Sequence, residues 1–138
     1  MQRKAQQLAA RLDDRYALGR VHFVEGHAAH LDGRWRESSQ ALARAEEILR
    51  EGCPEAAPQL ELSAALRMYN LRYCGDLAAL AAQVPPLLRE AVEQGRLSQE
   101  AIVRLIAGFL LPLREDDADA AEAEVREAER RFAGQPFN

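Results

Sequence analysis

The chain has 138 residues, of which 48% are apolar and 29% charged, and its wealth of alanine, leucine, glutamate and arginine favours a single all-helical globular domain. Its 18 basic and 22 acidic residues give a net charge of −4 and are interspersed, which argues against nucleic-acid binding through a basic face. Cys53 and Cys74 are too few for a disulfide framework. The longest nearly apolar run, residues 105–113, is shorter than the roughly 20 residues that span a bilayer, so we expect a soluble cytoplasmic protein.

Helical periodicity first appears over residues 3–12, which we interpret as the end of a preceding helix, and then over residues 15–31. The apolar stripe of the second helix consists of Leu18, Val21, Val24, Ala28 and Leu31. Gly19 and Gly26 lie inside it, and each costs about 1 kcal/mol relative to alanine. Because glycines seven residues apart share a helix face, we expect a neighbouring helix to approach closely there.

A break at Gly33 precedes a helix predicted over residues 35–50, and a loop with Pro54 and Pro58 precedes one over residues 59–74. The stripe of the first helix is Ala41, Leu42, Ala45, Ile48 and Leu49. The stripe of the second is Leu62, Ala65, Leu66, Tyr69 and Tyr73. Both patterns predict helices with one core-facing side.

Three more helical segments follow, over residues 76–94, 100–113 and 118–132. Pro85 and Pro86 lie inside the first, and an interior proline costs roughly 3 kcal/mol and removes a backbone donor. We therefore expect a kink or break just before them. The second segment is apolar nearly all round, so we expect it to be covered on more than one side.

Short polar side chains placed before these segments predict helix N-caps. The predicted caps are Asp13-Asp14, Asp76, Ser98 and Asp116-Asp117. Glycines close the preceding segments at Gly33, Gly75, Gly95 and Gly134, which is typical of helix C-termini.

The breaks at Gly33, Gly75 and Asp116 are spaced about 40 residues apart, which indicates a repeat. Each is followed at the same intervals by three small or apolar residues: Ser38, Leu42 and Ala45; Leu80, Val84 and Leu87; Ala121, Val125 and Ala128. One helical hairpin cannot bury both of its faces, whereas stacked hairpins can. We therefore predict an all-α fold of class α-solenoid, a right-handed stack of about three antiparallel hairpins. The single domain spans residues 1–138, with units at about 15–52, 58–95 and 98–134.

The first unit resembles a tetratricopeptide repeat, through Gly26, Gly33, Ser38, Leu42 and Ala45. In that family the small residues at the equivalents of Gly26, Ser38 and Ala45 mark tight helix contacts. The chain departs from the family in three ways: the period exceeds the usual 34 or so residues, Met68 replaces a glycine in the second unit, and the terminal proline is shifted. The resemblance is therefore to a tetratricopeptide-like array.

A further resemblance covers most of the chain, through residues 31–37, 44–53, 77–80 and 84–91. These segments are similar to the helical-repeat region that lies C-terminal to the catalytic domain in large bacterial serine/threonine protein kinases. The resemblance implies a non-catalytic interaction or regulatory fragment of such a kinase. The kinase motifs themselves are absent from the sequence: it has no glycine-rich phosphate loop, no His-Arg-Asp and no Asp-Phe-Gly. Similar arrays in bacterial transcriptional regulators and signalling ATPases leave a sensor segment as an alternative.

The register of the resemblance implies a concave surface lined by the first helix of each hairpin. The implied peptide-groove residues are Arg20, Phe23, His27 and His30 in the first unit and Leu62, Tyr69, Arg72 and Tyr73 in the second. Aromatic and arginine side chains favour peptide binding because they combine area with directional donors; ordinary packing of Tyr69 and Tyr73 between hairpins is the alternative. The third unit offers Val103, Ile106 and Leu110, which are either core or covered by a further repeat or a second copy.

The expected partners are therefore a protein or peptide, or other domains of a parent chain, without nucleic acid or membrane. A homo-oligomer through the apolar terminal hairpin stays open. Trp35, which opens a helix, is expected to pack at the hairpin turn.

Candidate chemistry is sparse. His22, His27 and His30 lie close together on one predicted helix, so a small metal protein or enzyme is a further alternative, but we expect surface histidines because no third ligand has helical spacing. The pairs Glu46-Glu47, Asp116-Asp117 and Glu122 with Glu124 have arginines nearby, and we expect ion pairs on solvated helix faces. We predict no catalytic residue, no cofactor and no bound metal.

Overall fold

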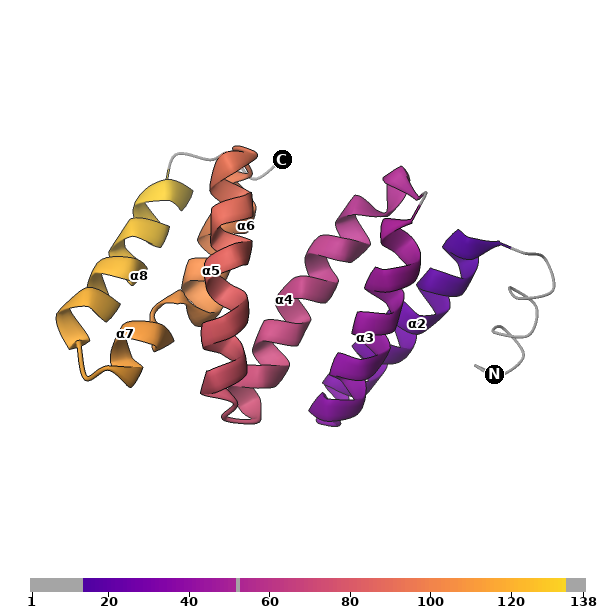
Figure 1. Ribbon diagram of the computed structural model, residues 1–138, viewed down its shortest axis with the longest axis horizontal. Helices are drawn as coiled ribbons and strands as arrows, with labels where there is room; N and C mark the ends of the chain where they lie inside the picture. The colour runs from indigo at the N-terminus through magenta and orange to yellow at the C-terminus, as the bar shows by residue number, and fades with distance from the viewer. Residues whose placement is uncertain (1–13, 52, 134–138) are drawn as a thin grey trace. The chain divides into compact units, whose positions relative to one another are not determined.

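The structure is a computed structural model that describes residues 14–51 and 53–133, and every regular element in those ranges is helical (Figure 1). The chain divides into two compact units, Met1–Asn70 and Leu71–Asn138. The helix expected over residues 3–12 and the chain end from residue 134 lie outside the described residues. The all-helical class is confirmed within the described part.

The first unit holds α2 (Arg15–Leu31), α3 (Trp35–Arg50), the 3₁₀ turn η1 (Pro54–Ala56) and most of α4 (Ala57–Tyr73). The predicted bounds of α2 and α3 are confirmed, and α4 begins two residues before its predicted start. Asp14 caps α2, because its Oδ1 accepts a hydrogen bond from the Ala17 N–H at 2.9 Å. The side chain of this short residue thus satisfies one donor of the first turn.

The two interior glycines of α2 lie where α3 comes closest, as predicted. A Cβ at Gly26 would be 2.5 Å from Leu42 Cγ and 3.1 Å from the Leu42 backbone nitrogen. A Cβ at Gly19 would be 2.5 Å from Leu49 Cγ. Gly26, near the turn, meets Leu42 early in α3, whereas Gly19, farther from the turn, meets Leu49 late in α3. The helices α2 and α3 therefore form an antiparallel hairpin (Figure 1).

The apolar stripe predicted for α2 is wrong in part. Val24 is 55% exposed and Leu31 is 76% exposed, whereas α2 buries Gly19, Gly26 and Ala29. The leucines of α3 fill the space that the glycines leave, so the buried face of α2 is the one with the smallest side chains. A hydrophobicity pattern cannot identify such a face, because glycine contributes no apolar side chain.

The stripe of α3 is confirmed at Leu42, Ala45, Ile48 and Leu49, which are all buried, while Ala41 is half-buried. The core of the unit is a cluster formed by Ala45, Leu49, Cys53 and Ala56, with the partly buried Tyr16, Phe23 and Leu60 packed against it. On α4 the predicted stripe holds only at Leu66, since Leu62 and Tyr73 are exposed and Ser63, Met68 and Asn70 are buried instead.

The second unit contains α5 (Leu77–Glu93), α6 (Leu97–Val103), the π-helical segment η2 (Arg104–Gly108), α7 (Leu110–Arg114) and α8 (Ala118–Phe132). α6 packs against α5 and α8, and α7 packs against α5 and α8. The buried apolar residues of the unit are Leu80, Val84, Ala91, Ala101, Val103, Ile106, Ala107, Ala121 and Ala128. The bounds predicted for α8 are confirmed.

The sequence predicts a kink or a break at the proline pair, and the break is wrong, because α5 continues through Pro85 and Pro86. Both prolines are exposed, while Leu80 and Val84 on the opposite side are buried in the core. Packing of that face therefore outweighs the two backbone hydrogen bonds that the prolines cannot make.

The single helix predicted over residues 100–113 is also wrong. α6 begins at Leu97, so Ser98 lies inside it and caps nothing, and no side chain caps this end. The helix then changes to π geometry over η2 before α7. Pro112 has no N–H for the Gly108 carbonyl, so the α-helical register is not enforced at this point.

The expectation that this apolar segment is covered on more than one side is confirmed in part, because α5 and α8 both pack against α6 and η2, but the cover is incomplete. Ile102 and Leu105 are each 38% exposed and Leu113 is 45% exposed within the described structure.

The turns before α3, α5, α6 and α8 share one geometry. Gly33, Gly75 and Gly95 have φ values of 75°, 68° and 64°, and Asp116 has 59°. In each turn the next N–H bonds the carbonyl five residues back, at 2.8–3.0 Å, which is the Schellman helix end. Asp76 and Asp117 then cap α5 and α8 through the amides of Ala79 and Ala120, as predicted.

The three predicted triplets lie on α3, α5 and α8 and face the core of their own unit. Seven of the nine residues are buried, and Leu87 and Val125 are half-buried. The equal spacing of the triplets after equivalent turns therefore reflects equivalent packing roles.

Candidate interaction surface

A row of aromatic and basic side chains follows one face of α2. The Arg20 guanidinium lies 5.7 Å from the centre of the Tyr16 ring. Further along, the rings of Phe23 and His27 meet edge to face with centroids 6.0 Å apart. Arg20 is exposed and the three aromatic residues are half-buried, so the row is partly accessible to solvent.

The row ends at His30, which joins α2 to α4. The His30 and Tyr69 rings lie with centroids 6.4 Å apart, and His30 Nδ1 is 2.7 Å from Asn70 Oδ1. The Asn70 Nδ2 group donates to Ser38 Oγ at 2.8 Å and to Ser39 Oγ at 3.2 Å. Because the amide nitrogen donates to the serines, its oxygen accepts from His30, and this assigns the Nδ1–H tautomer to the neutral imidazole.

Sequence patterns missed Asn70, although it is 1% exposed and ties three helices together. Its position four residues after the buried Leu66 was a usable signal. A polar residue at helical spacing from the core is compatible with burial only if its hydrogen bonds are made.

The remaining implied groove residues are Leu62, Arg72 and Tyr73. Leu62 is 40% exposed on α4 in the first unit, whereas Arg72 and Tyr73 belong to the second unit. Arg72 is engaged there: its Nη1 donates to the Ile106 carbonyl at 3.4 Å, and its guanidinium lies 5.3 Å from the centre of the Phe109 ring. Arg72 therefore braces the π-helical segment, so a substitution there tests folding of the second unit as well as binding.

The corresponding residues of the third predicted unit are mostly core. Val103 is 1% exposed and Ile106 is 3% exposed, while Leu110 is half-buried. Of the two alternatives for this set, core packing thus applies to the first two residues.

The three histidines have different surroundings. His22 Nδ1 lies 3.1 Å from Glu25 Oε2, His27 packs on Phe23, and His30 pairs with Asn70. Within the described ranges, no three His, Cys, Asp or Glu side chains come close enough together to hold a metal ion. Trp35, at the hairpin turn, is half-buried.

The ion pairs expected around Glu46 and Glu47 are present, but their setting is not uniformly solvated. Arg44 pairs with Glu47 at 2.7 Å on the surface. The Glu46 side chain is only 8% exposed and pairs with Arg67 of α4 at 2.9 Å and with Arg50 at 3.4 Å. Glu46 therefore links α3 to α4 across the first unit.

On α8, Glu122 and Arg126 form the expected exposed i,i+4 pair. Glu124 instead pairs with Arg104 of η2, which is a contact between elements rather than within one helix. Asp116 occupies the positive-φ position of the turn before α8, and Asp117 caps that helix.

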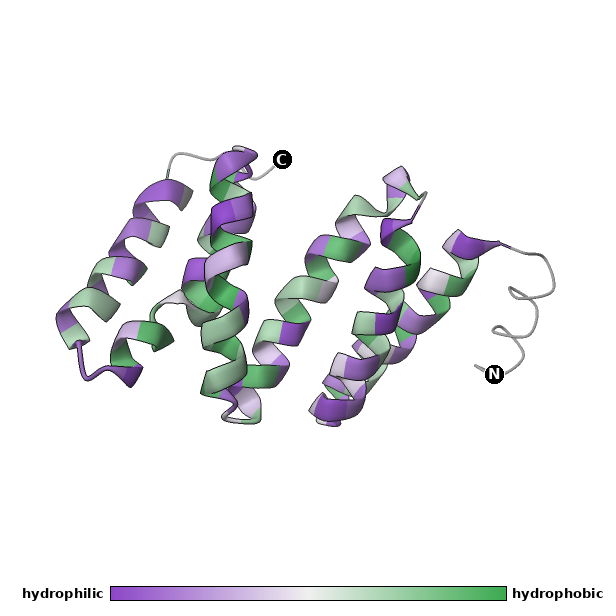
Figure 2. Cartoon of the chain, viewed as in Figure 1, coloured by the Kyte–Doolittle hydropathy of each residue, from purple (hydrophilic) through white to green (hydrophobic). Residues whose placement is uncertain are grey.

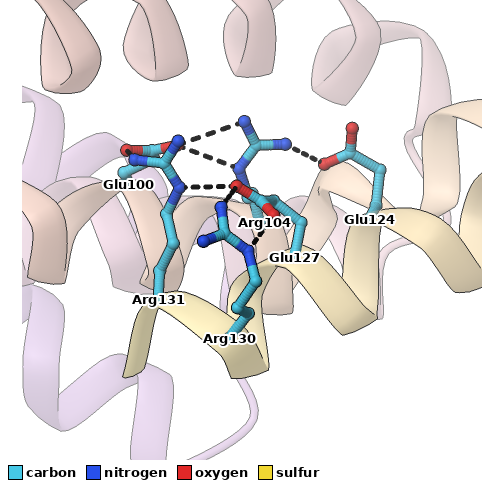
Figure 3. Close-up of polar contacts among 6 residues, drawn as sticks. All are labelled: Glu100, Arg104, Glu124, Glu127, Arg130 and Arg131. Carbon is cyan, nitrogen blue, oxygen red and sulfur yellow. Dashed lines mark hydrogen bonds and ion pairs between the residues drawn. The ribbon is translucent and has the colours of Figure 1, made fainter. Parts of the chain in front are cut away.

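The most deeply buried charge, Glu100, was missed by the sequence patterns. It is 1% exposed, its Oε1 accepts from Arg104 Nε and Nη2 at 3.2 Å, and its Oε2 accepts from Arg131 Nη1 at 2.8 Å (Figure 3). Its spacing of four from Arg104 was a readable signal. Its contact with Arg131, 31 residues away, was not.

Two pKa shifts accompany this cluster. Burial alone would lower the pKa of Arg104, but its hydrogen bonds to Glu124 and Glu100 raise that pKa above its ordinary value. Hydrogen bonds from Arg130 and then Arg131 lower the pKa of Glu127 to about 2, from an ordinary value of 4.5. Arg104 and Glu127 therefore both stay charged near neutral pH.

Comparison of the chain with protein-family models, curated proteins and solved structures finds no match. Among the described residues, no helix combines the length and apolar character needed to cross a membrane.

Proposed function

We propose that the chain is a non-catalytic, tetratricopeptide-like scaffold that binds a protein or peptide partner. The proposal rests on a recurring structural pattern. The helices α3, α5 and α8 each follow a turn residue with positive φ, namely Gly33, Gly75 and Asp116. Each of these helices also packs its triplet towards the core of its unit. Recurring helical units of this kind favour stacking, and stacked units form extended binding surfaces.

The polar groups of the two units support a non-catalytic role. The buried Asn70, Glu46 and Glu100 each bond side chains of another helix. Such bonds use donors and acceptors for holding helices together, whereas catalysis needs groups that reach a substrate.

The row Arg20, Phe23, His27 and His30 is the proposed contact surface. It lies on the first helix of a hairpin, and it combines half-buried rings with an exposed guanidinium. Residues of these types dominate peptide-binding energetics, because they bury much area while keeping directional donors.

A random peptide display library selected against the full chain tests this proposal. The affinity of enriched peptides, measured by calorimetry, should fall at least about tenfold for the double variant Arg20→Ala/His27→Ala, as is common for interface anchors. Arg44→Ala is the matched control, because Arg44 is an exposed arginine of α3 that pairs only along its own helix. Enriched peptides whose affinity is equal for both variants would exclude this surface.

The kinase context rests on the similarity of residues 31–37, 44–53, 77–80 and 84–91 to the C-terminal repeat region of bacterial serine/threonine kinases. In that context the chain would bind either a peptide partner or another domain of its own parent protein. Sequencing the complete gene tests the context directly: a kinase domain upstream would support it, and an upstream DNA-binding or ATPase domain would replace it.

A further inference from the structure

Over residues 118–131, helix α8 contributes little apolar side chain to the second unit. In that range it buries the apolar residues Ala121 and Ala128 and half-buries Ala120 and Val125. In Figure 2 the ribbon of α8 alternates between purple, hydrophilic residues and green, hydrophobic ones. Since burial energy grows with apolar area, these alanines and one half-buried valine contribute less than the leucine and isoleucine side chains that α3 buries.

Ionic contacts take the place of that apolar area. Arg131 of α8 reaches Glu100 of α6 at 2.8 Å, and Glu124 of α8 pairs with Arg104 of η2 (Figure 3). Glu127 accepts from Arg131 at 2.7 Å and so holds the arginine in place. Two charges of each sign therefore alternate across the contact of α8 with the rest of the unit.

The exposure of these groups is strongly one-sided. On α8, the side chains of Glu124, Glu127 and Arg131 are 32%, 30% and 31% exposed, whereas Glu100 and Arg104 are 1% and 14% exposed. When α8 leaves, its own charges return to water and Glu100 keeps Arg104 as a partner. Neither side is then left with an unpaired buried charge, which is the usual obstacle to separating a buried ion pair.

The turn before α8 is also the most strained of its kind. Asp116 is the one non-glycine residue with positive φ in the described chain, and Gly33, Gly75 and Gly95 occupy the same position in the other three turns. An L-residue pays a steric penalty in this region that glycine does not. Opening the turn relieves that penalty.

We propose that α8 is a detachable helix. It docks on α6 and η2 through the network around Glu100, and it undocks as one element about residues 115–117 while α5 and α6 stay folded. Undocking turns the buried Glu100 carboxylate and its apolar neighbours into accessible surface. This goes beyond scaffolding, because it gives the second unit two states with different surfaces.

Hydrogen–deuterium exchange with mass spectrometry on the full chain tests the proposal. Glu100→Gln keeps the size of the side chain and removes its charge, so exchange in α8 should accelerate about tenfold or more while α5 is unaffected. The matched control is Glu122→Gln on α8, since Glu122 pairs only with Arg126 along the helix. Equal acceleration of α5 and α8, or no change in α8, would overturn the proposal.

Two further variants keep the test decisive if Glu100→Gln does not fold. Arg131→Gln removes only the α8 side of the contact and leaves Glu100 with Arg104, and the same selective acceleration of α8 is expected. Asp116→Gly relieves the strained turn and should slow exchange in α8 by about twofold to fivefold. Unchanged exchange of α8 in Arg131→Gln, or faster exchange in Asp116→Gly, would contradict the detachable helix.

Discussion

Asn70 Nδ2 donates a hydrogen bond to Ser38 Oγ at 2.8 Å, and both residues are at most 1% exposed. The two lie 32 residues apart in the sequence, so this bond is one of the contacts that fix α4 against the α2–α3 hairpin. Because Asn70 also accepts from His30, one amide satisfies partners on both helices of the hairpin.

Replacing this amide should destabilise the first unit. Asn70→Ala removes the amide that bonds the buried Ser38 hydroxyl and the His30 ring, and the free energy of unfolding should fall by about 1–3 kcal/mol. Urea denaturation followed by fluorescence reports this unit selectively, since Trp35 is the only tryptophan. Ser39→Ala is the control. It removes only the longer hydrogen bond, which the half-buried Ser39 hydroxyl accepts from Asn70, so it should cost less than about 1 kcal/mol.

Filling the close contact between α2 and α3 should also destabilise it. Gly26→Ala places a methyl group 3.1 Å from the Leu42 backbone nitrogen, so overpacking of about 1–3 kcal/mol should exceed the roughly 1 kcal/mol gain in helix propensity. Gly19→Ala meets only side-chain atoms of Leu49 and Ile48, which can rotate, so it should cost less. Thermal unfolding followed by Trp35 fluorescence measures both effects. A higher melting temperature for Gly26→Ala than for the native chain would contradict this packing.

Removing an interior proline should stabilise α5. Pro86→Ala restores a donor for the carbonyl four residues before it, and up to about 3 kcal/mol of stability is expected because the side chain is exposed. Pro58→Ala is the matched control, since Pro58 lies in the first turn of α4, where proline is tolerated. Circular dichroism should show a higher melting temperature for Pro86→Ala alone, and equal melting of both variants would argue against the continuous helix.

Acid should weaken α8. The pKa of Glu127 is about 2 in the folded chain and 4.5 ordinarily, so its stabilising effect is complete above about pH 4.5 and is lost as the pH falls toward 2. The protection of α8, that is, its exchange rate relative to the intrinsic rate at the same pH, should fall over this range in the native chain and respond less in Glu127→Gln. A carbon-13 titration of the Glu127 carboxyl measures the shift directly, and a midpoint near 4.5 would refute it.

The sequence predicts local structure well where one residue determines it. The bounds of α2, α3 and α8, the caps at Asp14, Asp76 and Asp117, and the close approach at Gly19 and Gly26 all follow from short-range chemistry. The failures have a common cause. At Pro85 and Pro86, and at Val24 and Leu31, tertiary packing decides which face is buried and whether a helix continues.

The candidate surfaces show the same division. The row on α2 was implied by the register of the family resemblance, and its role in binding stays a prediction. The pairs that hold helices together, such as Glu46 with Arg67 and Glu100 with Arg131, could not be predicted, because a single sequence carries no signal for contacts across 21 and 31 residues. Arg72 was assigned to a groove for the same reason, since its partners at Ile106 and Phe109 are as distant.

The two cysteines give the molecule a built-in pair of chemical reporters. Cys74 is exposed at the end of α4, whereas Cys53 is buried in the core of the first unit at 7% exposure. A thiol-reactive dye should therefore modify Cys74 within minutes in the native chain and reach Cys53 only when that core opens. The native sequence can thus carry a fluorophore on Cys74 without mutagenesis. The slower labelling of Cys53 then measures how often the core of the first unit opens.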